Sequence, residues 1–198
     1  MVVGRARELL DEQGADGFSM VRLAEGLGVT TMALYRHVTD RGDLEHAVVE
    51  LVLGELASPA PIPDDWEACV ADWMNAVRQC WIAHPWIGGM LGSRTELSPP
   101  WLAAVDRLTA ILMGASLSPT AVAREAVHIS RTTVGVLLLE VSAPLPHNHM
   151  AEAAITHLPE SAWARWQSIA AVLSEYGNDE LFHDFVRTTL VRLSKECR

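Results

Sequence analysis

Residues 23–38, LAEGLGVTTMALYRHV, constrain the fold more than any other stretch of the 198-residue chain. Two helical patterns meet there at Gly28, and each is too short to be stable without packing against other elements. Glycine permits the left-handed backbone that turns a chain sharply. Ala24, four residues before Gly28, is small enough for the two helices to cross closely. Leu34 and Val38 can face a shared core, so the spacing is that of a helix-turn-helix.

The other side chains of the second pattern point outward once Leu34 and Val38 lie inside. They are Thr30, Thr31, Met32, Ala33, Tyr35, Arg36 and His37. Hydroxyl groups can bond phosphates or base edges, methyl groups can touch thymine, and arginine can bind guanine through two hydrogen bonds. We therefore expect a helix that contacts DNA. The alternative is an ordinary three-helix cap with a polar face.

The charge balance argues at first against a nucleic-acid partner. The chain carries 25 acidic and 15 basic residues, a net charge of -10, whereas affinity for polyanions comes mostly from Lys and Arg. The distribution of charge favours DNA locally, because no acidic residue lies between Glu25 and Asp40. Arg36 and His37 lie inside this window, and Arg22 and Arg41 flank it. We expect a modest non-specific affinity.

The rest of the chain is expected to be all-α, because apolar residues recur at spacings of three and four and no segment sustains the alternation of a strand. The prolines at 59, 61 and 63 mark the best boundary, which predicts domains 1–57 and 58–198. Leu51 and Leu102 are placed on inward faces, and Val29 is expected to plug the turn. The expected helices are 3–13, stopped at Gly14, 20–27 with Ser19 as cap, a third capped by Thr30, one from Asp40, 66–83, one from Pro99, 119–141, one around 163–173, and 179–195.

The sequence shows no segment that would direct the protein to a membrane or out of the cell. No apolar run approaches the roughly 20 residues that cross a bilayer, and the first residues do not form a signal peptide. The three cysteines form no CxxC pair, which suits a reducing compartment. We expect a cytoplasmic protein. Cys69 and Cys80 share a helix face, so a redox sensor is the alternative to two buried small apolar residues.

Residues 5–56 resemble the DNA-binding domain of the tetracycline-repressor (TetR) family of bacterial transcription regulators. The resemblance rests on ARELLDEQG, Gly17-Phe18-Ser19, LAEGLGV, LYRHV and Asp43-Leu44, in register and without a gap. LYRHV and the C-terminal layout are closer to the tetracycline repressors proper. The resemblance implies a homodimer whose third helices enter successive major grooves of a palindromic operator. A ligand in the larger domain would change their separation and release the DNA.

The resemblance also implies individual contacts. Ser19, Thr31, Met32, Tyr35 and His37 match DNA-contacting positions of the family, and Arg41 matches a basic residue at the start of the fourth helix. Two departures, Val21 for a basic residue and Arg36 for a tryptophan, indicate a different operator. The basic arm that precedes the first helix in many relatives has no counterpart here, so minor-groove and extra phosphate contacts from such an arm are not expected. The full expected DNA-binding set is Ser19, Met20, Arg22, Thr30, Thr31, Met32, Tyr35, Arg36, His37 and Arg41.

All seven tryptophans lie after the proline-rich stretch, so the second part of the chain is built differently from the first. Such a set can bind a flat, largely apolar molecule, although a tryptophan at helical spacing more often belongs to the core. His147 and His149 are too weak a signal for a metal, and we expect neither a metal nor another cofactor. The candidate ligand-binding residues are Trp73, Val77, Trp81, Trp86, Met90, Trp101, Met113, His128, Arg131, Thr132 and Trp163.

The last helix carries an apolar face that a partner subunit can cover in a four-helix bundle with the helix 119–141. The candidate interface residues are Phe182, Phe185, Val186, Thr189 and Leu190, and the alternative is that they pack only within the monomer. No nucleophile–base constellation, phosphate loop or HExxH motif indicates an enzyme. We expect a ligand-responsive repressor, with a binding module that has lost its operator as the alternative.

Overall fold

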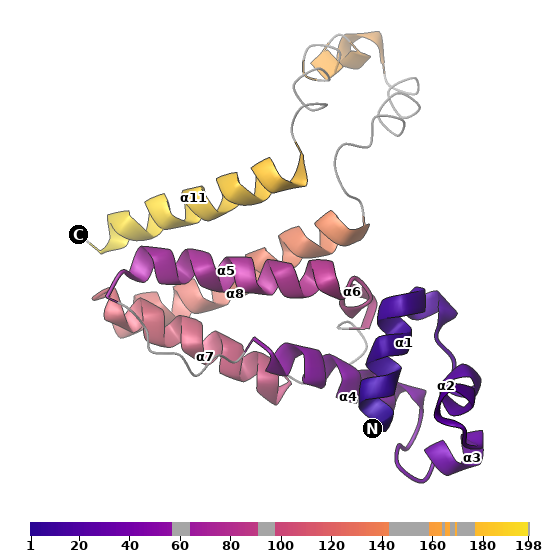
Figure 1. Cartoon of the computed structure of the whole chain (residues 1–198). Helices are drawn as coiled ribbons and strands as arrows, with labels where there is room; N and C mark the ends of the chain where they lie inside the picture. The colour runs from indigo at the N-terminus through magenta and orange to yellow at the C-terminus, as the bar shows by residue number, and fades with distance from the viewer. Residues whose placement is uncertain are drawn as a thin grey trace. The chain divides into compact units, whose positions relative to one another are not determined.

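The computed structural model describes residues 1–56, 64–90, 98–142, 159–163, 165–166, 169 and 177–197, and contains no strand among them. The fold is all-α, as predicted (Figure 1). Its named helices are α1 (Val2–Gly17), α2 (Met20–Leu27), α3 (Thr31–Leu34), α4 (Arg41–Gly54), α5 (Trp66–Ala83), α6 (Ile87–Met90), α7 (Pro99–Gly114), α8 (Pro119–Ser142) and α11 (Asn178–Glu196).

The chain forms two compact units, Met1–Thr133 and Val134–Arg198. The first contains α1 to α7 and the first part of α8, and the second contains the end of α8 and α11. None of the helices in the described ranges is both long enough and apolar enough to cross a bilayer.

The first three helices share one small core, which we call the head (residues 2–38). α1 packs against α2, and α2 packs against α3 (Figure 1). The side chains that fill the core are Ala6, Leu9, Leu10, Phe18, Leu23, Ala24, Leu34 and Val38. Gly14 interrupts α1 at φ 69°, ψ 178°, where the sequence predicts a stop, although a further helical turn follows to Gly17. A residue with a side chain adopts this backbone reluctantly, so glycine fixes the position of the break.

Three predicted caps are confirmed. The hydroxyl of Ser19 accepts a hydrogen bond from the backbone N–H of Arg22 at 3.2 Å. Thr30 and Asp40 cap α3 and α4 in the same manner. Each such cap stabilises a helix by about 1 kcal/mol, which matters for α2 and α3 because they are short.

α4 runs from the head into the remainder of the first unit. It packs against both α1 and α7, and its buried side chains are Leu44, Val48, Val49, Val52 and Leu53. The sequence analysis placed Leu51 on the same face, but this side chain is 42% exposed. The buried arc is centred on Val48, Val49 and Val52, and Leu51 lies beyond its edge.

α5 and α7 pack side by side (Figure 1). The predicted stripe of α5 is buried from Val70 to Trp81, while Trp66 at its start is half-buried. α7 buries Ala104, Leu108, Ile111 and Leu112. Leu102 was expected inside and is instead 49% exposed, because it lies on the side of α7 away from Ala104 and Leu108.

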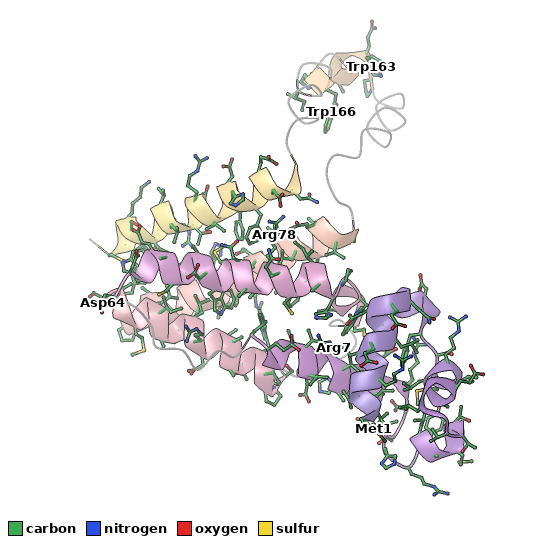
Figure 2. The ribbon with its side chains drawn as sticks, viewed as in Figure 1. Met1, Arg7, Asp64, Arg78, Trp163 and Trp166 are labelled. Carbon is green, nitrogen blue, oxygen red and sulfur yellow. The ribbon has the colours of Figure 1, made fainter. Side chains whose placement is uncertain are left out.

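In the second unit, α11 has one buried and one exposed side. Phe182, Val186, Thr189 and Leu193 are buried, whereas Leu181 and Val191 are exposed. Trp163 and Trp166, labelled in Figure 2, are also exposed. Of the helix expected around 163–173, residues 164, 167–168 and 170–173 lie outside the described residues.

Candidate nucleic-acid interface and ligand site

The turn between α2 and α3 is built around Gly28, which adopts the left-handed conformation with φ 67° and ψ 30°. Its N–H donates to the carbonyl of Glu25 at 3.1 Å, and the next N–H, of Val29, donates to the carbonyl of Ala24 at 3.0 Å. These bonds satisfy the end of α2, as in a Schellman-type ending. The predicted role of Gly28 is confirmed, but Val29 is 45% exposed and does not plug the turn. Leu34 fills the core beneath the turn instead.

α3 itself is a single turn, and hydrogen bonds from Tyr35, Arg36, His37 and Val38 to carbonyls of residues 31–34 continue it to Val38. Leu34 and Val38 face inward, as predicted. Met32 and Tyr35 are 71% and 47% exposed. Thr30, Arg36 and His37 are exposed, while Thr31 and Ala33 are half-buried. The outward side of this segment therefore presents the residues that the sequence analysis placed there.

The three arginines around α3 differ in the hydrogen bonds and ion pairs that they form within the chain. Arg22 binds the Gln13 side chain at 2.7 Å and the Gly17 carbonyl at 2.9 Å, so it fastens α2 to α1. Arg41 pairs with Glu45 at 2.6 Å and stacks over the ring of Phe18 at 5.3 Å. Arg36 makes no hydrogen bond or ion pair within the described part of the chain. It is the basic group most available to a partner.

Two members of the expected DNA-binding set have structural roles. Met20 is 8% exposed and packs in the core of the head. Ser19 is half-buried, and its hydroxyl is engaged as the cap of α2. Met20, Ser19, Arg22 and Arg41 are therefore left out of the surface considered below. We call it the α3 surface: Thr30, which also caps α3, Thr31, Met32, Tyr35, Arg36 and His37.

Three tryptophans of the first unit gather between α5 and α7. The ring of Trp101 lies 6.1 Å from that of Trp73 and 6.2 Å from that of Trp81. The indole N–H of Trp73 donates to the carbonyl of Ala104 at 2.7 Å. The indole N–H of Trp81 is fully buried and has no hydrogen-bond partner. An unpaired buried donor costs about 1–3 kcal/mol, so Trp81 retains a donor that a ligand can use.

The other candidate ligand residues fall into distinct places. Val77 is buried and Met90 is half-buried. Trp86 is buried, but its N–H donates to Asp11 at 2.8 Å, away from the tryptophan cluster. Met113 is 66% exposed, and Trp163 is exposed as well. These last two positions do not line the interior of the chain.

The candidates on α8 lie on its outer side. His128 and Arg131 are exposed, and the half-buried Thr132 bonds the carbonyl of His128 at 2.6 Å. Among the buried polar residues of α8, which also include Glu125 and Ser130, Thr133 is fully buried and has an unpaired hydroxyl. The sequence analysis missed Thr133, although it follows the core residues Val122, Ala126 and Ile129 at helical spacing. Among the described side chains of this unit, Thr133 and Trp81 are the buried ones with an unpaired hydrogen-bonding atom.

The cysteines are free thiols. Burial raises the pKa of Cys69, and it raises the pKa of Cys80 to about 12. Both thiols are therefore protonated at neutral pH, which disfavours the redox-sensor alternative. Among the described residues no group of three or more His, Cys, Asp or Glu side chains could hold a metal. His147 and His149 lie outside the described residues.

The chain matches two family profiles. Residues 3–48 match the bacterial regulatory proteins of the tetR family, and residues 58–178 match the tetracyclin repressor-like C-terminal domain. An HTH-type transcriptional regulator of Saccharopolyspora erythraea is 28% identical over 77% of this chain and 63% of the relative. The chain thus spans less than two thirds of that regulator's length. The Escherichia coli tetracycline repressor protein class C is 28% identical over 91% of this chain and 83% of the repressor.

Solved structures agree with these matches. A possible TetR family transcriptional regulator from Streptomyces coelicolor superimposes with a TM-score of 0.83 at 25% identity, covering 98% of this chain and 97% of that one. ActR from the same species, solved in complex with actinorhodin, superimposes with a TM-score of 0.78 over 97% of this chain and 92% of its own. At 23% identity the likeness to ActR concerns the fold alone.

Proposed function

The chain belongs to the TetR family of bacterial regulatory proteins, and from this premise we propose that it is a homodimeric, ligand-responsive transcriptional repressor of the bacterial cytoplasm. We propose that residues 1–57 bind a palindromic operator. Residues 58–198 bind a small, largely apolar or aromatic effector and the partner subunit. The family consists of regulators, so the chain is not an enzyme, as its sequence indicates.

The α3 surface carries the operator-binding proposal. It combines exposed hydroxyl, thioether, phenol, imidazole and guanidinium groups in a window without acidic residues. Arg36, which has no partner within the described residues, can read guanine or bind phosphate, and Tyr35 can bond phosphate. Because the turn at Gly28 and the two helix caps fix the backbone, these side chains are presented on a rigid element. Specific contacts can therefore outweigh the net charge of -10 over the short range of the Debye length.

Dimerisation follows from the geometry of the duplex. Two α3 segments must lie about one helical turn apart, roughly 34–36 Å, to enter successive major grooves. Phe182, Val186 and Thr189 of the expected interface are already buried within one chain, and Phe185 contacts Phe182 at 6.1 Å between ring centroids. Exposed apolar side chains among the described residues of these helices include Leu138 and Leu139 on α8 and Leu181 and Val191 on α11. We propose that these residues extend the interface.

The effector is proposed to bind at the tryptophan cluster of Trp73, Trp81 and Trp101. Aromatic faces and edges favour a planar apolar molecule. The unpaired Trp81 N–H favours a molecule that also carries a hydrogen-bond acceptor. The dimer is proposed to have two states that differ in the distance between its heads. An effector changes the balance between these states only if it binds one of them more tightly than the other.

A second candidate function is a helical binding module that has lost its operator. Val21 favours it, because this exposed side chain is apolar at a position where the tetracycline repressors carry a basic residue. Operator binding decides between the two functions, since the module would keep ligand binding and lose DNA binding.

The test is selection of duplexes from a random pool by the purified protein, followed by fluorescence anisotropy with the selected duplex. The repressor should select a palindrome, and its affinity should fall steeply with salt, because phosphate contacts release counterions. Arg36→Ala should weaken binding, whereas the charge-matched Arg187→Ala on α11 should not. Absence of any selected duplex at low salt would establish the binding module instead.

A further inference from the structure

The carboxylate of Asp11 ties α1 of the head to the turn between α5 and α6. Its Oδ1 accepts a hydrogen bond from the Trp86 indole N–H at 2.8 Å and lies 2.7 Å from Nδ1 of His84. An ionised carboxylate can only accept, so the imidazole Nδ1–H is the donor. One oxygen atom on α1 thus holds two donors from the α5–α6 turn.

Both donors are fixed to the ends of their helices. The backbone N–H of His84 donates to Cys80 and closes α5, and its carbonyl accepts from Ile87, the first residue of α6, at 3.0 Å in each case. The rings of His84 and Trp86 pack 5.6 Å apart, and both side chains are buried. Any displacement of the end of α5 therefore displaces both donors.

The second oxygen of Asp11 faces the end of α4. Oδ2 lies 3.5 Å from the guanidinium Nε of Arg7, whose Nη1 pairs with Glu55 at 2.5 Å. Glu55 is the C-terminal cap residue of α4. Figure 2 labels Arg7, whose side chain leaves α1 for this ion pair. The ends of α4 and α5 and the start of α6 thus meet α1 in one polar cluster.

This polar cluster connects the helix that carries part of the proposed effector site with the helix that supports the proposed operator-binding surface. α5 carries Trp73 and Trp81 of the proposed effector site, and α1 packs directly against α2 of the head. Hydrogen bonds weaken steeply when distance or angle changes, whereas apolar side chains can slide past one another. Asp11 therefore gives a small movement of the α5–α6 turn a direct polar route to α1, beside the packing of α4 against α1.

We propose that Asp11 is a positioning residue that couples the effector site to the head, by passing movement of the α5–α6 turn to α1 through His84 and Trp86. The inference rests on the proposed function, since it concerns communication between an effector site and an operator site. Coupling between two sites is reciprocal. DNA bound at the head must therefore change the α5–α6 turn as well, which allows a test with DNA alone.

Three substitutions separate the coupling from mere structural support. Asp11→Ala removes the acceptor for both donors but retains a residue that favours helix. Asp11→Asn keeps an acceptor oxygen at the same place and should rescue the coupling. Trp86→Phe keeps an aromatic ring and removes one donor. Asp16→Ala removes an exposed carboxylate from the same helix and serves as the matched control.

The experiment measures hydrogen–deuterium exchange of residues 80–90 with and without the duplex that the wild type selects. We expect the bound duplex to change exchange in this segment about threefold or more in the wild type, Asp11→Asn and Asp16→Ala. The change should be lost in Asp11→Ala and Trp86→Phe, although both variants still bind the duplex. If Asp11→Ala does not fold, Trp86→Phe decides.

Three results would each overturn the inference alone: a duplex that binds without changing exchange in residues 80–90 of the wild type, an unchanged response in a folded Asp11→Ala, or an unchanged response in Trp86→Phe. A wild type that selects no duplex would instead refute the proposed function, and the coupling would fall with it. The two failures are therefore distinguishable in one series of measurements.

Discussion

Tyr35 and Arg36 are adjacent in sequence, exposed, and outside the core that Leu34 and Val38 fill. We predict that Tyr35→Ala and Arg36→Ala each weaken operator binding by about 5- to 150-fold, because each removes a contact of the kind worth roughly 1–3 kcal/mol. Thermal unfolding should shift little, since exposed substitutions change the free energy of unfolding by about 0.5 kcal/mol or less. Anisotropy and calorimetry measure the two effects. A large loss of stability would mean that α3 is rotated relative to this description.

Cys80 offers a residue-level test of burial. Because burial raises its pKa to about 12, the reactive thiolate is a fraction of roughly one in ten thousand at pH 8. We predict that iodoacetamide labels Cys80 in the native protein far more slowly than in urea-unfolded protein, as measured by peptide mass spectrometry. Stability should also fall as the pH rises from about 9 toward 12, because the unfolded thiol ionises there and the folded thiol does not. Fast native labelling near neutral pH would revive the redox-sensor alternative.

The side chains of α8 show that the sequence alone did not identify which polar residues of this helix are buried. The sequence analysis chose His128, Arg131 and Thr132 for the ligand, whereas the buried polar residues of α8 are Glu125, Ser130 and Thr133. Periodicity contained the answer, because Ile129 and Thr133 are one turn apart. Chemistry misled the choice, since His and Arg are the more recognisable ligand groups. Asp11 could not be found in this way, because its partner His84 lies 73 residues away and no local pattern relates them.

At the scale of elements, the turn at Gly28 fixes how α3 follows α2. A Cβ built at Gly28 meets nothing within 4 Å, so a substitution there suffers from backbone strain and not from a clash. We predict that Gly28→Ala lowers the free energy of unfolding by about 1 kcal/mol, because φ of 67° is unfavourable for alanine. Gly4→Ala in α1 is the matched control, since its Cβ is equally unobstructed in a regular helix.

Gly4→Ala should instead raise stability slightly, by about 0.5 kcal/mol, as alanine favours helix over glycine. Chemical denaturation of the two variants measures both signs. Equal effects in both variants would mean that the left-handed turn is not needed for the fold.

The helices themselves were largely predictable, for two separate physical reasons. Caps are local, so Ser19, Thr30 and Asp40 could be identified from the residues that follow them. Apolar stripes identify a helix and its approximate inward side, as in α5. They do not fix the width of the buried arc, which depends on neighbouring elements. Leu51 and Leu102 were therefore misplaced.

At the scale of the whole molecule, the proposed repressor requires two heads held at a fixed spacing. In one chain by itself, Leu139 on α8 is 66% exposed and Val191 on α11 is 53% exposed. Such large apolar side chains on long helices are natural dimer contacts, because homodimer interfaces are enriched in apolar area. Phe182, first expected at this interface, is already buried within one chain, whereas Phe185 and Leu190 are half-buried and stay predicted interface residues.

We predict that Leu139→Asp and Val191→Asp produce monomers, since a carboxylate buried at a subunit interface without a partner costs several kcal/mol. Sedimentation should show half the wild-type mass, and operator affinity should fall at least about a hundredfold, because one head alone cannot hold two half-sites. Leu102→Asp, at an exposed leucine of α7, is the control and should remain dimeric. If both α8 and α11 variants sediment as dimers, these helices do not form the interface, and the spacing of the heads must be set by another surface.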